Sequence, residues 1–267
     1  MKTFAGRVAV VTGAGSGIGL ALAERFGREG MNVVLADVSV ERLEEAVVRV
    51  ETAGASGAVG IVTDVRDPDA VESLARRAVE TYGGVHLLCN NAGVSAIGYL
   101  WQTPLEDWRW VLDVNLLGIV NGLRSFVPLL LEQDEAHVVN TASMAAFVTS
   151  AGMGAYIASK HGAVGVSKAL RADLAARWPH VGVTVVCPGA VATNLADNVR
   201  TPGRPQDAAR VDALRASLEG AFAAADVAEM VVATVLAGRF WVFPDGGAHV
   251  AALEAELAEL RRDVDRS

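Results

Sequence analysis

The chain has 267 residues, of which 52% are hydrophobic and 20% are charged, and its formal net charge is −8 at pH 7. The acidic balance argues against a nucleic-acid partner, because phosphate backbones require a basic face. No uncharged apolar stretch reaches the ~20 residues of a membrane helix. The start at Met1 leads almost directly into a predicted strand, so we expect no membrane span and no secretory signal.

The length exceeds that of an average domain, but single α/β domains of this size are common. The two cysteines, Cys89 and Cys187, both fall in apolar runs that are typical of core strands. We therefore expect them to be reduced, buried and inert, as in a cytoplasmic protein.

Short apolar runs alternate with helical segments along the chain, which predicts a parallel sheet covered on both faces. The predicted strands are Val8–Val11, Asn32–Ala36, Val59–Val62, His86–Cys89, His137–Thr141, Val183–Cys187 and Phe240–Phe243. The predicted helices are Ile18–Arg28, Val40–Thr52, Pro68–Thr81, Pro104–Leu131, Gly154–Arg177 and Asp226–Ala237. Pro128 should bend or end the long helix that contains it, because its ring clashes with the preceding turn.

A glycine-rich turn with the spacing Gly13-x-x-x-Gly17-x-Gly19 joins the first predicted strand to the first helix. The missing Cβ atoms let a pyrophosphate approach the backbone, and the free N–H groups of the helix point at it. Such a turn is often only a tight connection. Asp37, which follows Gly19 by 18 residues at the end of the second strand, favours dinucleotide binding.

Asp37 also predicts which dinucleotide is bound. A carboxylate there accepts hydrogen bonds from ribose hydroxyls and repels a 2′-phosphate. The neighbours Val38, Ser39 and Ser16 bring no positive charge, and only Arg42 offers a partner for a phosphate. Asp37 can at the same time act as the N-cap of the helix from Val40. We expect NAD rather than NADP.

Tyr156 and Lys160 are four residues apart and therefore neighbours on one helical face. A nearby ammonium favours the phenolate, so the pKa of Tyr156 should fall toward neutrality and suit it to proton transfer. The pair alone is common on solvated helices, and its significance depends on the accompanying motifs.

Together these motifs resemble the short-chain dehydrogenase/reductase family, in its single-domain branch. The matching segments are Thr12-Gly13-Ala14-Gly15-Ser16-Gly17-Ile18-Gly19, Asn90-Asn91-Ala92-Gly93, Asn115, Ser143, Tyr156-x-x-x-Lys160 and Pro188-Gly189. The resemblance implies a Rossmann-like, doubly wound, mainly seven-stranded parallel sheet in one domain over residues 1–267. It also implies an NAD(H)-dependent oxidoreductase that interconverts a secondary alcohol and a ketone, without a metal.

The resemblance implies four catalytic residues. Tyr156 is the acid/base, Lys160 lowers its pKa and holds the nicotinamide ribose, and Ser143 polarises the substrate oxygen. Asn115 holds a water that relays protons to Lys160, or is simply a satisfied amide within a packed helix. We treat Ser159 as non-catalytic.

Further cofactor contacts follow from the same resemblance. Asp64 and Val65 should lie beside adenine, although Asp64 can equally be the cap of the helix from Pro68. Val191 should meet the carboxamide. The remaining expected contacts are Gly13, Ser16, Gly17, Ile18, Gly19, Asn91, Gly93, Pro188, Gly189 and Thr193.

Residues 194–222 are polar, proline-rich and then weakly helical, which suggests a substrate lid. Within them we interpret residues 200–205 as an exposed tip rather than an anion-recognition patch. The tail departs from the family pattern, because residues 248–264 form an amphipathic extension whose apolar stripe needs cover from its own domain or from a partner subunit. A homo-oligomer, dimer or tetramer, is the family expectation.

The candidate substrate residues are mostly apolar, which suits a hydrophobic or aromatic alcohol. They include Ser95, Ala145, Met153 and Leu195. Two other classes remain open. One is a non-catalytic NAD-sensing or scaffold protein, and the other is a sugar-nucleotide epimerase or dehydratase, although the sequence lacks the Thr-Gly-x-x-Gly-x-x-Gly turn and longer C-terminal domain of such enzymes.

Overall fold

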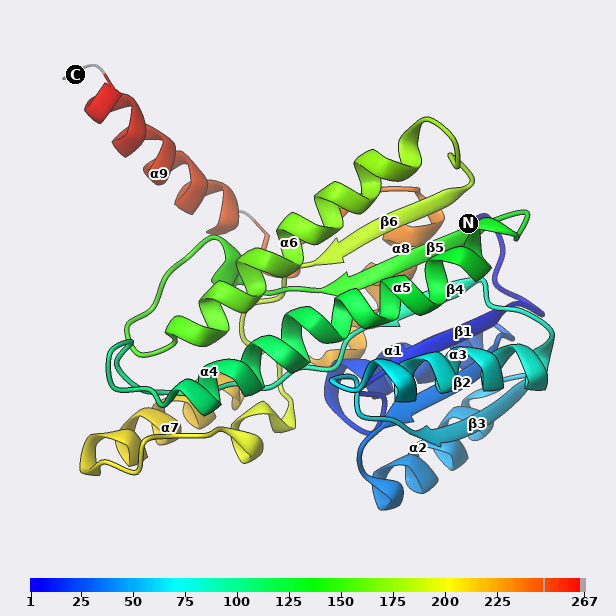
Figure 1. Cartoon of the computed structure of the whole chain (residues 1–267), viewed down its shortest axis with the longest axis horizontal. Helices are drawn as coiled ribbons and strands as arrows, with labels where there is room; N and C mark the ends of the chain where they lie inside the picture. The colour runs from blue at the N-terminus through cyan, green and yellow to red at the C-terminus, as the bar shows by residue number, and fades with distance from the viewer. Residues whose placement is uncertain (247, 265–267) are drawn as a thin grey trace.

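The computed structural model describes residues 1–246 and 248–264. Within them, seven strands form one parallel sheet in the order β3-β2-β1-β4-β5-β6-β7 (Figure 1). The strands are β1 (Val8–Thr12), β2 (Asn32–Asp37), β3 (Gly57–Val62), β4 (Leu87–Asn90), β5 (Ala136–Thr141), β6 (Val181–Val186) and β7 (Trp241–Val242). The strand order reverses between β1 and β4, and open α/β sheets bind ligands at this kind of switch point. The predicted Rossmann-like fold is confirmed.

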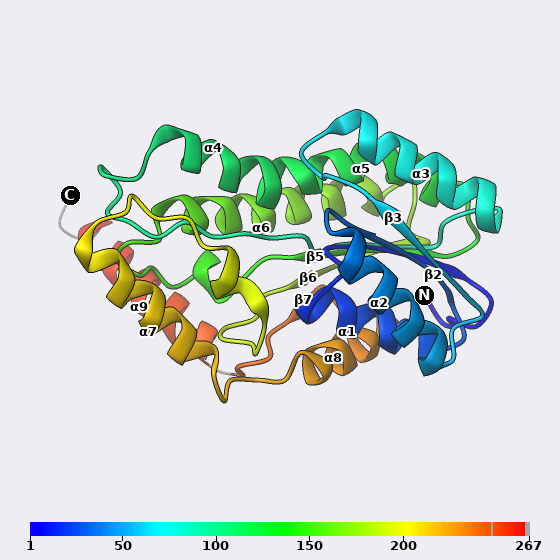
Figure 2. The same cartoon turned by 90° about the horizontal axis from the view of Figure 1, so that it is seen from below.

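Helices cover both faces of the sheet, as expected (Figure 2). One layer holds α1 (Gly17–Arg28), α2 (Val40–Ala53) and α8 (Ala224–Leu236). The other holds α3 (Pro68–Tyr82), a long helical stretch over Leu105–Leu131 and α6 (Gly154–Ala175). Each layer buries its own apolar cluster against the sheet, around Phe26 on the first face and Phe126 on the second. Cys89 and Cys187 are buried in the core and form no disulfide, as predicted.

The long helical stretch is not one continuous α-helix. It consists of α4 (Leu105–Leu112), a π-helical turn η1 (Asp113–Leu117) and α5 (Gly118–Leu131). Pro128 lies inside α5, so the expectation that it could end the helix is wrong. A proline near the C-terminal end of a helix removes a single backbone hydrogen bond, and the packed helix continues past it to Leu131.

This same stretch, Leu105–Leu131, is long and apolar enough to cross a membrane by length and composition. It carries charged residues, which distinguishes it from an uncharged membrane segment. In its most apolar window 39% is buried inside the protein, and helices in the cores of globular proteins pass the same test. One such helix is a weak indication of a membrane span.

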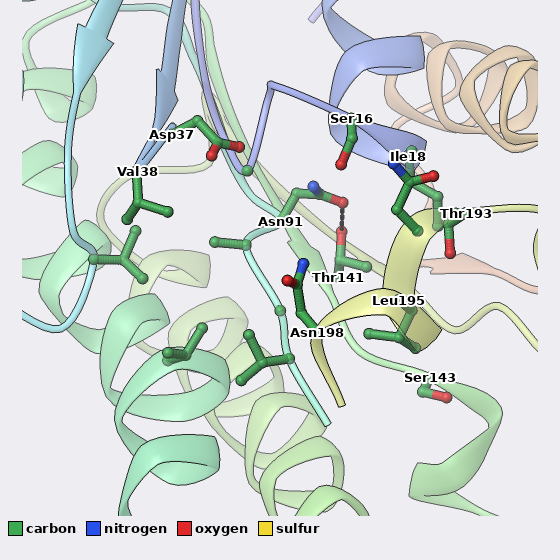
Figure 3. A pocket seen from close by; sticks show the side chains of 18 of the residues that line it. Ser16, Ile18, Asp37, Val38, Asn91, Thr141, Ser143, Thr193, Leu195 and Asn198 are labelled. Atoms are coloured by element: carbon green, nitrogen blue, oxygen red, sulfur yellow. Dashed lines mark hydrogen bonds between the residues drawn. The ribbon is translucent and has the colours of Figure 1, made fainter. Parts of the chain in front are cut away.

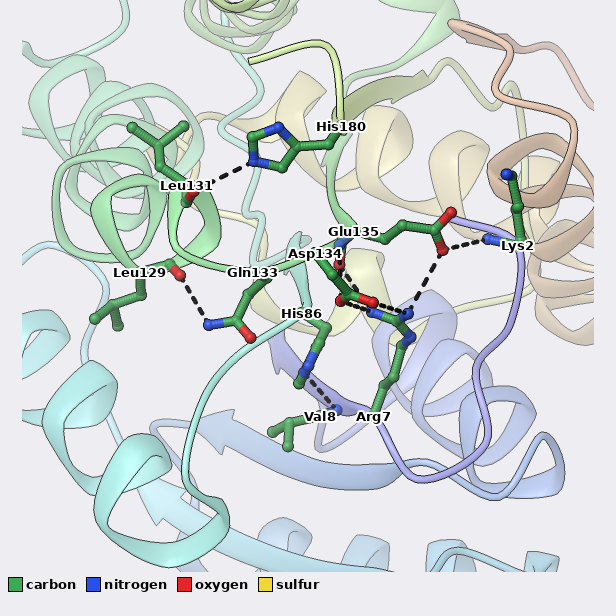
Figure 4. Close-up of polar contacts among 10 residues, drawn as sticks. All are labelled: Lys2, Arg7, Val8, His86, Leu129, Leu131, Gln133, Asp134, Glu135 and His180. Atoms are coloured by element: carbon green, nitrogen blue, oxygen red, sulfur yellow. Dashed lines mark hydrogen bonds and ion pairs between the residues drawn. The ribbon is translucent and has the colours of Figure 1, made fainter.

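Polar contacts secure the amino-terminal edge of the sheet (Figure 4). The Arg7 guanidinium donates to both carboxylate oxygens of Asp134, at 2.8 and 3.0 Å, and to the carbonyl of Glu135 at 3.0 Å. His86 accepts a hydrogen bond from the Val8 N–H at 3.2 Å. These contacts join the start of β1 to the segments that precede β4 and β5. The opposite, carboxyl-terminal edge carries the candidate site.

Two segments lie outside the sheet and its covering layers. Residues 194–222 form a 3₁₀ turn, η3 (Asn194–Asn198), and the helix α7 (Pro205–Leu218). The tail forms α9 (Ala248–Val264), which projects away from the domain (Figure 1). The expected apolar stripe of α9, from Leu253 through Leu257 to Leu260, is exposed to solvent.

Candidate active site

A cavity of about 660 Å³ opens along the carboxyl-terminal edge of the sheet. In Figure 3, Asp37 and Val38 lie at one end, and Ser143 and Leu195 lie at the other. Most of the predicted cofactor residues line it, namely Gly13, Ser16, Gly17, Ile18, Asp37, Asp64, Val65, Asn91, Gly93, Tyr156, Lys160, Pro188, Gly189, Val191 and Thr193. Residues from nearly all of the predicted motifs therefore line one cavity.

The glycine turn depends on missing side chains. Gly13 and Gly17 have φ values of +64° and +55°, which side chains strongly disfavour. A Cβ on Gly19 would lie 2.1 Å from the carbonyl oxygen of Gly13. Gly19 is not among the lining residues, so its role is to let the turn close on itself. A Cβ on Gly17 would meet the Thr193 side chain at 3.0 Å, which shows how closely the two loops approach.

Asp37 holds two backbone groups beside the cavity. Its carboxylate accepts hydrogen bonds from the N–H of Gly15 at 3.0 Å and from the N–H of Ser39 at 3.2 Å. The N-cap of α2 is Ser39, whose hydroxyl accepts from the Arg42 N–H. The prediction that Asp37 is the N-cap of α2 is wrong. The Arg42 side chain belongs to the same end of the cavity.

Asp64 forms a two-pronged ion pair with Arg66, a cavity residue that the sequence reasoning missed. This hydrogen bonding, chiefly from the Arg66 side chain, lowers the pKa of Asp64. The cap of α3 is Asp67, which accepts from the Asp69 N–H at 3.0 Å. The alternative role of Asp64 as that cap is therefore wrong.

Asn91 connects three neighbouring strands at their carboxyl ends. Its Nδ2 donates to the Thr12 carbonyl at 3.1 Å, and its backbone N–H donates to the Thr12 hydroxyl at 2.9 Å. Its Oδ1 accepts from the Thr141 hydroxyl at 3.1 Å (Figure 3). Asn91 thus fixes the middle of the cavity floor by linking the ends of β1, β4 and β5.

Lys160 lies on the cavity side of α6 and is almost fully buried. Its Nζ donates to the Thr141 carbonyl at 3.0 Å and lies 5.5 Å from the centre of the Tyr156 ring. Burial lowers the pKa of Lys160 to about 8, because a dehydrated ammonium is less stable than a neutral amine. The carbonyl of Thr141 keeps the amino group directed toward the cavity.

Tyr156 differs from the sequence expectation in the sign of its pKa shift. Burial raises the pKa of the phenol, and a hydrogen bond with the Ser143 side chain opposes the rise without cancelling it. The expectation of a lowered pKa for Tyr156 is wrong for the protein's own groups, because burial destabilises the charged phenolate and is the largest influence on this pKa. Ser143 also accepts from the Ala145 N–H at 3.1 Å and donates to the Pro188 carbonyl at 3.3 Å.

Asn115 lies in the π-helical turn η1 and is completely buried. Its Oδ1 accepts from the Val94 N–H at 2.8 Å, while its Nδ2 donates to the Val94 carbonyl at 2.9 Å and to the Ser159 hydroxyl at 3.0 Å. Ser159 in turn donates to the Tyr156 carbonyl at 2.7 Å. Asn115 is thus a satisfied packing amide that also ties η1 to α6. Its role in a proton relay stays a prediction.

The other end of the cavity lies beside Ser143 and Tyr156. Of the candidate substrate residues, Leu195 lines the cavity, whereas Ser95, Ala145 and Met153 are not among the described residues that do. The lining here is largely apolar and comes from the segment after β4, the long helical stretch and the segment 194–222. It comprises Val94, Trp110, Val114, Leu195, Asn198, Val199, Arg200 and Leu218. Arg200, Gly203 and Arg204 are exposed, as predicted for this segment, although Arg200 also contributes to the cavity wall.

The family model described as short chain dehydrogenase matches residues 7–203. The chain belongs to this family. A 1-deoxy-11-beta-hydroxypentalenate dehydrogenase from Streptomyces exfoliatus is 41% identical over 247 residues, which cover 91% of this chain and 85% of the relative. The glycine turn, Ser143, Tyr156 and Lys160 all fall within the residues that the family model matches.

Two solved structures are similar over most of the chain. A short-chain dehydrogenase/reductase from Burkholderia phymatum in complex with NAD has a TM-score of 0.91 and 39% identity, and the match covers 98% of this chain and 97% of the other. An alcohol dehydrogenase from Thermococcus sibiricus, complexed with 5-hydroxy-NADP, has a TM-score of 0.75 and 25% identity, with 89% and 95% covered. The protein is therefore an oxidoreductase of the alcohol dehydrogenase/ketone reductase type with a nicotinamide cofactor.

Proposed function

We propose that this protein oxidises a secondary alcohol with an apolar body to its ketone, with NAD+ as the acceptor, and runs the reverse reduction with NADH. The observation that carries the proposal is the position of Tyr156, Lys160 and Ser143 in the same cavity as the glycine turn and Asp37. A proton-transfer group and a dinucleotide site therefore share one cleft.

The residues present fit a dinucleotide. The backbone of Gly13 and Gly17 adopts conformations that exclude side chains, and the free N–H groups of α1 begin directly after Ser16. Asp37 lies at one end for the ribose hydroxyls, and Asn91, Gly189 and Val191 border the middle and far parts of the cavity. When bound, the nicotinamide accepts or supplies the hydride at the carbinol carbon.

The protein's own residues handle the proton. In oxidation, the phenolate oxygen of Tyr156 takes the proton of the substrate hydroxyl as the C–H hydride leaves, so a ketone forms. The Ser143 hydroxyl would turn its proton from the Pro188 carbonyl to the same substrate oxygen and hold that oxygen against Tyr156. Lys160 supplies a positive charge close to the phenol ring, and its bond to the Thr141 carbonyl keeps it there. The apolar walls exclude water from the exchange.

The preference for NAD over NADP rests on Asp37. Its carboxylate faces the cavity end where the adenosine ribose belongs, and a 2′-phosphate there would meet a like charge. At ~4 Å in a partly screened site such a repulsion is worth roughly 4 kcal/mol. Arg42 lies at the same end and would reduce the repulsion. Relatives of known structure bind either cofactor, so the protein's own carboxylate decides the proposal.

The proposed substrate is apolar because the lining beside Ser143 and Tyr156 is apolar. Val94, Trp110 and Leu195 supply side chains that favour a hydrocarbon or aromatic body over a sugar phosphate. The Streptomyces relative is named for a hydroxylated substrate, in agreement with an alcohol as the reduced partner. We propose further that residues 194–222 act as a lid, since η3 and the end of α7 both contribute to the cavity wall.

We also propose a homo-oligomer in the cytoplasm. The exposed stripe of α9, centred on Leu257, is an apolar surface that a second subunit would cover. Two buried cysteines that form no disulfide suit a reducing compartment. Size-exclusion chromatography with light scattering, on the full chain and on Leu257→Glu, measures the assembly. A monomer for the full chain would contradict this part of the proposal.

The experiment that tests the proposed function is an absorbance screen at 340 nm. Purified protein is offered NAD+ or NADP+ with a panel of aliphatic, alicyclic and aromatic secondary alcohols, and NADH or NADPH with the matching ketones. We expect turnover with apolar secondary alcohols and higher kcat/KM with NAD+. Absence of turnover with every alcohol and ketone, from protein that binds NADH, would contradict the function.

A further inference from the structure

Arg200 is a half-exposed cation that lines the substrate end of the cavity. Its backbone N–H donates to the Ser95 carbonyl at 3.2 Å, and its own carbonyl accepts from the Ile97 N–H at 2.9 Å. Its guanidinium lies 4.0 Å from the ring centre of Trp110, which also lines the cavity. The two backbone bonds fix the start of the side chain and the indole supports its end, so the charge is pre-positioned.

The positive charge of Arg200 is only partly compensated. Asp107, whose side chain is almost buried, lies 3.5 Å from Nη1, which is long for a charge-assisted hydrogen bond. Among the described residues no other hydrogen bond to this guanidinium is formed. Arginine at such a site offers further N–H groups in a planar fork that matches a carboxylate. The cavity wall also contains the apolar residues Val94, Val114 and Leu218, while the Arg200 side chain keeps 47% of its surface exposed, so solvent screens part of its charge.

The other cations of the cavity are already accounted for. Lys160 is held by the Thr141 carbonyl beside Tyr156. Arg66 pairs with Asp64, and Arg42 lies in the first turn of α2, shortly after Asp37 in the sequence. Both arginines therefore belong to the adenosine end of the cavity. Arg200 differs from them because its backbone is joined to the segment after β4 and its side chain rests on the long helical stretch. Its position therefore serves the substrate rather than the dinucleotide.

We propose that Arg200 is the binding residue for a carboxylate on the substrate, so that the substrate is a hydroxy acid or keto acid. The apolar body would span the cavity between Arg200 and the carbinol carbon at Tyr156. This inference rests on the proposed function for its reacting group. Its anion-binding part, however, can be measured without turnover.

The test is calorimetric binding to protein saturated with NADH. The two probes are cyclohexanecarboxylate and cyclohexanecarboxamide, which share a ring and differ in charge. We expect the carboxylate to bind roughly ten- to hundredfold more tightly, as a charge-assisted bond allows. Arg200→Gln should abolish that preference and Arg200→Lys should keep part of it. Arg204→Gln, which removes a charge from an exposed position in the same segment, should leave it unchanged.

Equal binding of the two probes to the wild-type protein would overturn the inference, and so would a preference that survives in Arg200→Gln. The melting temperature and NADH affinity of each variant show whether it is folded. Turnover separates this inference from the proposed function. If the protein oxidises cyclohexanol but shows no carboxylate preference, only the Arg200 subsite is contradicted. If it prefers the carboxylate but oxidises no alcohol, including 4-hydroxycyclohexanecarboxylate, only the proposed reaction is contradicted.

Discussion

The carboxylate of Asp37 accepts a hydrogen bond from the backbone N–H of Gly15, at 3.0 Å. The residue proposed to select the cofactor is therefore also part of the support for the glycine turn. A substitution that removes the side chain changes two properties at once, the local charge and the shape of the phosphate-binding loop. Variants that separate these effects are needed to read cofactor preference correctly.

Asp37→Asn removes the charge and keeps one acceptor oxygen, which can serve the N–H of either Gly15 or Ser39. We expect the ratio of kcat/KM for NADP+ to that for NAD+ to rise at least about tenfold, since roughly 1.4 kcal/mol of repulsion is a modest share of the charge interaction. Asp37→Ala combined with Val38→Arg should raise it further by supplying a phosphate partner. A wild-type enzyme that used NADP+ as well as NAD+ would contradict the role given to Asp37.

Asn115 and Ser159 should differ in their effect on stability. Asn115→Ala leaves both the N–H and the carbonyl of Val94 without partners, so the free energy of unfolding should fall by about 2–4 kcal/mol. Ser159→Ala removes one hydrogen bond to Asn115 and one to the Tyr156 carbonyl, which is itself part of α6. The free energy of unfolding should therefore fall by only about 1 kcal/mol. Urea unfolding of both variants measures the difference. Equal losses would show that the two bonds to Val94 contribute little.

His137 predicts acid sensitivity of the fold. Its Nε2 bonds the Thr184 hydroxyl, which itself donates to the Arg239 carbonyl, so the imidazole must be the donor and Nδ1 carries no proton. Burial lowers the pKa of His137 to about 3, and among the described residues Nδ1 has no hydrogen-bond partner. The unfolded chain therefore binds a proton more readily than the folded one. Stability should be constant above pH ~6.5 and decline below it, by up to about 1.4 kcal/mol per pH unit for this group.

The measurement for His137 is the free energy of unfolding in urea at several pH values between 7 and 4. His137→Leu keeps an apolar side chain of similar size and leaves the Thr184 bond to Arg239 in place, so its slope should be shallower than that of the wild type. Identical slopes would rule out His137 as a source of the acid sensitivity.

The pH dependence of catalysis depends on the Tyr156–Lys160 pair. Burial raises the pKa of Tyr156 and lowers that of Lys160 to about 8, so the pair as a whole should lose its first proton near the lysine value. The positive nicotinamide of NAD+ favours the arrangement in which the phenol has lost that proton. Alcohol oxidation should therefore rise with pH through an apparent pKa near 8, while ketone reduction should fall.

This profile is measured as kcat/KM in both directions across pH 5 to 10 at constant ionic strength. A primary deuterium isotope effect checks that hydride transfer limits the rate. If oxidation were independent of pH under that condition, Tyr156 would not be its base.

Much of the fold could be predicted because buried parallel strands have a simple sequence pattern, a short run of apolar residues. Six of the predicted strands overlap the observed ones by at least three residues, and the seventh, Phe240–Phe243, contains all of β7. The position of the site at the carboxyl edge of the sheet could also be predicted, because glycines and polar residues recur directly after the strands. Helix caps were less predictable, since Asp37 and Ser39, or Asp64 and Asp67, are equally suitable by residue type.

The remaining features depend on tertiary contacts that spacing does not encode. The π-helical turn around Asn115 is fixed by bonds to Val94, more than twenty residues earlier in the sequence. Arg200 enters the cavity wall because its backbone joins Ser95 and its side chain rests on Trp110. The sign of the Tyr156 pKa shift depends on burial, which four-residue spacing cannot reveal.

The most direct test of the account is the comparison of turnover and NADH binding in Tyr156→Phe. The change removes only the hydroxyl that transfers the proton, so we expect activity to fall by at least about a thousandfold while the Kd for NADH changes little. Lys160→Ala, which removes the cation that is bonded to Thr141, should weaken both properties. Retention of more than a few per cent of wild-type activity by Tyr156→Phe would contradict the assignment of Tyr156 as the acid/base.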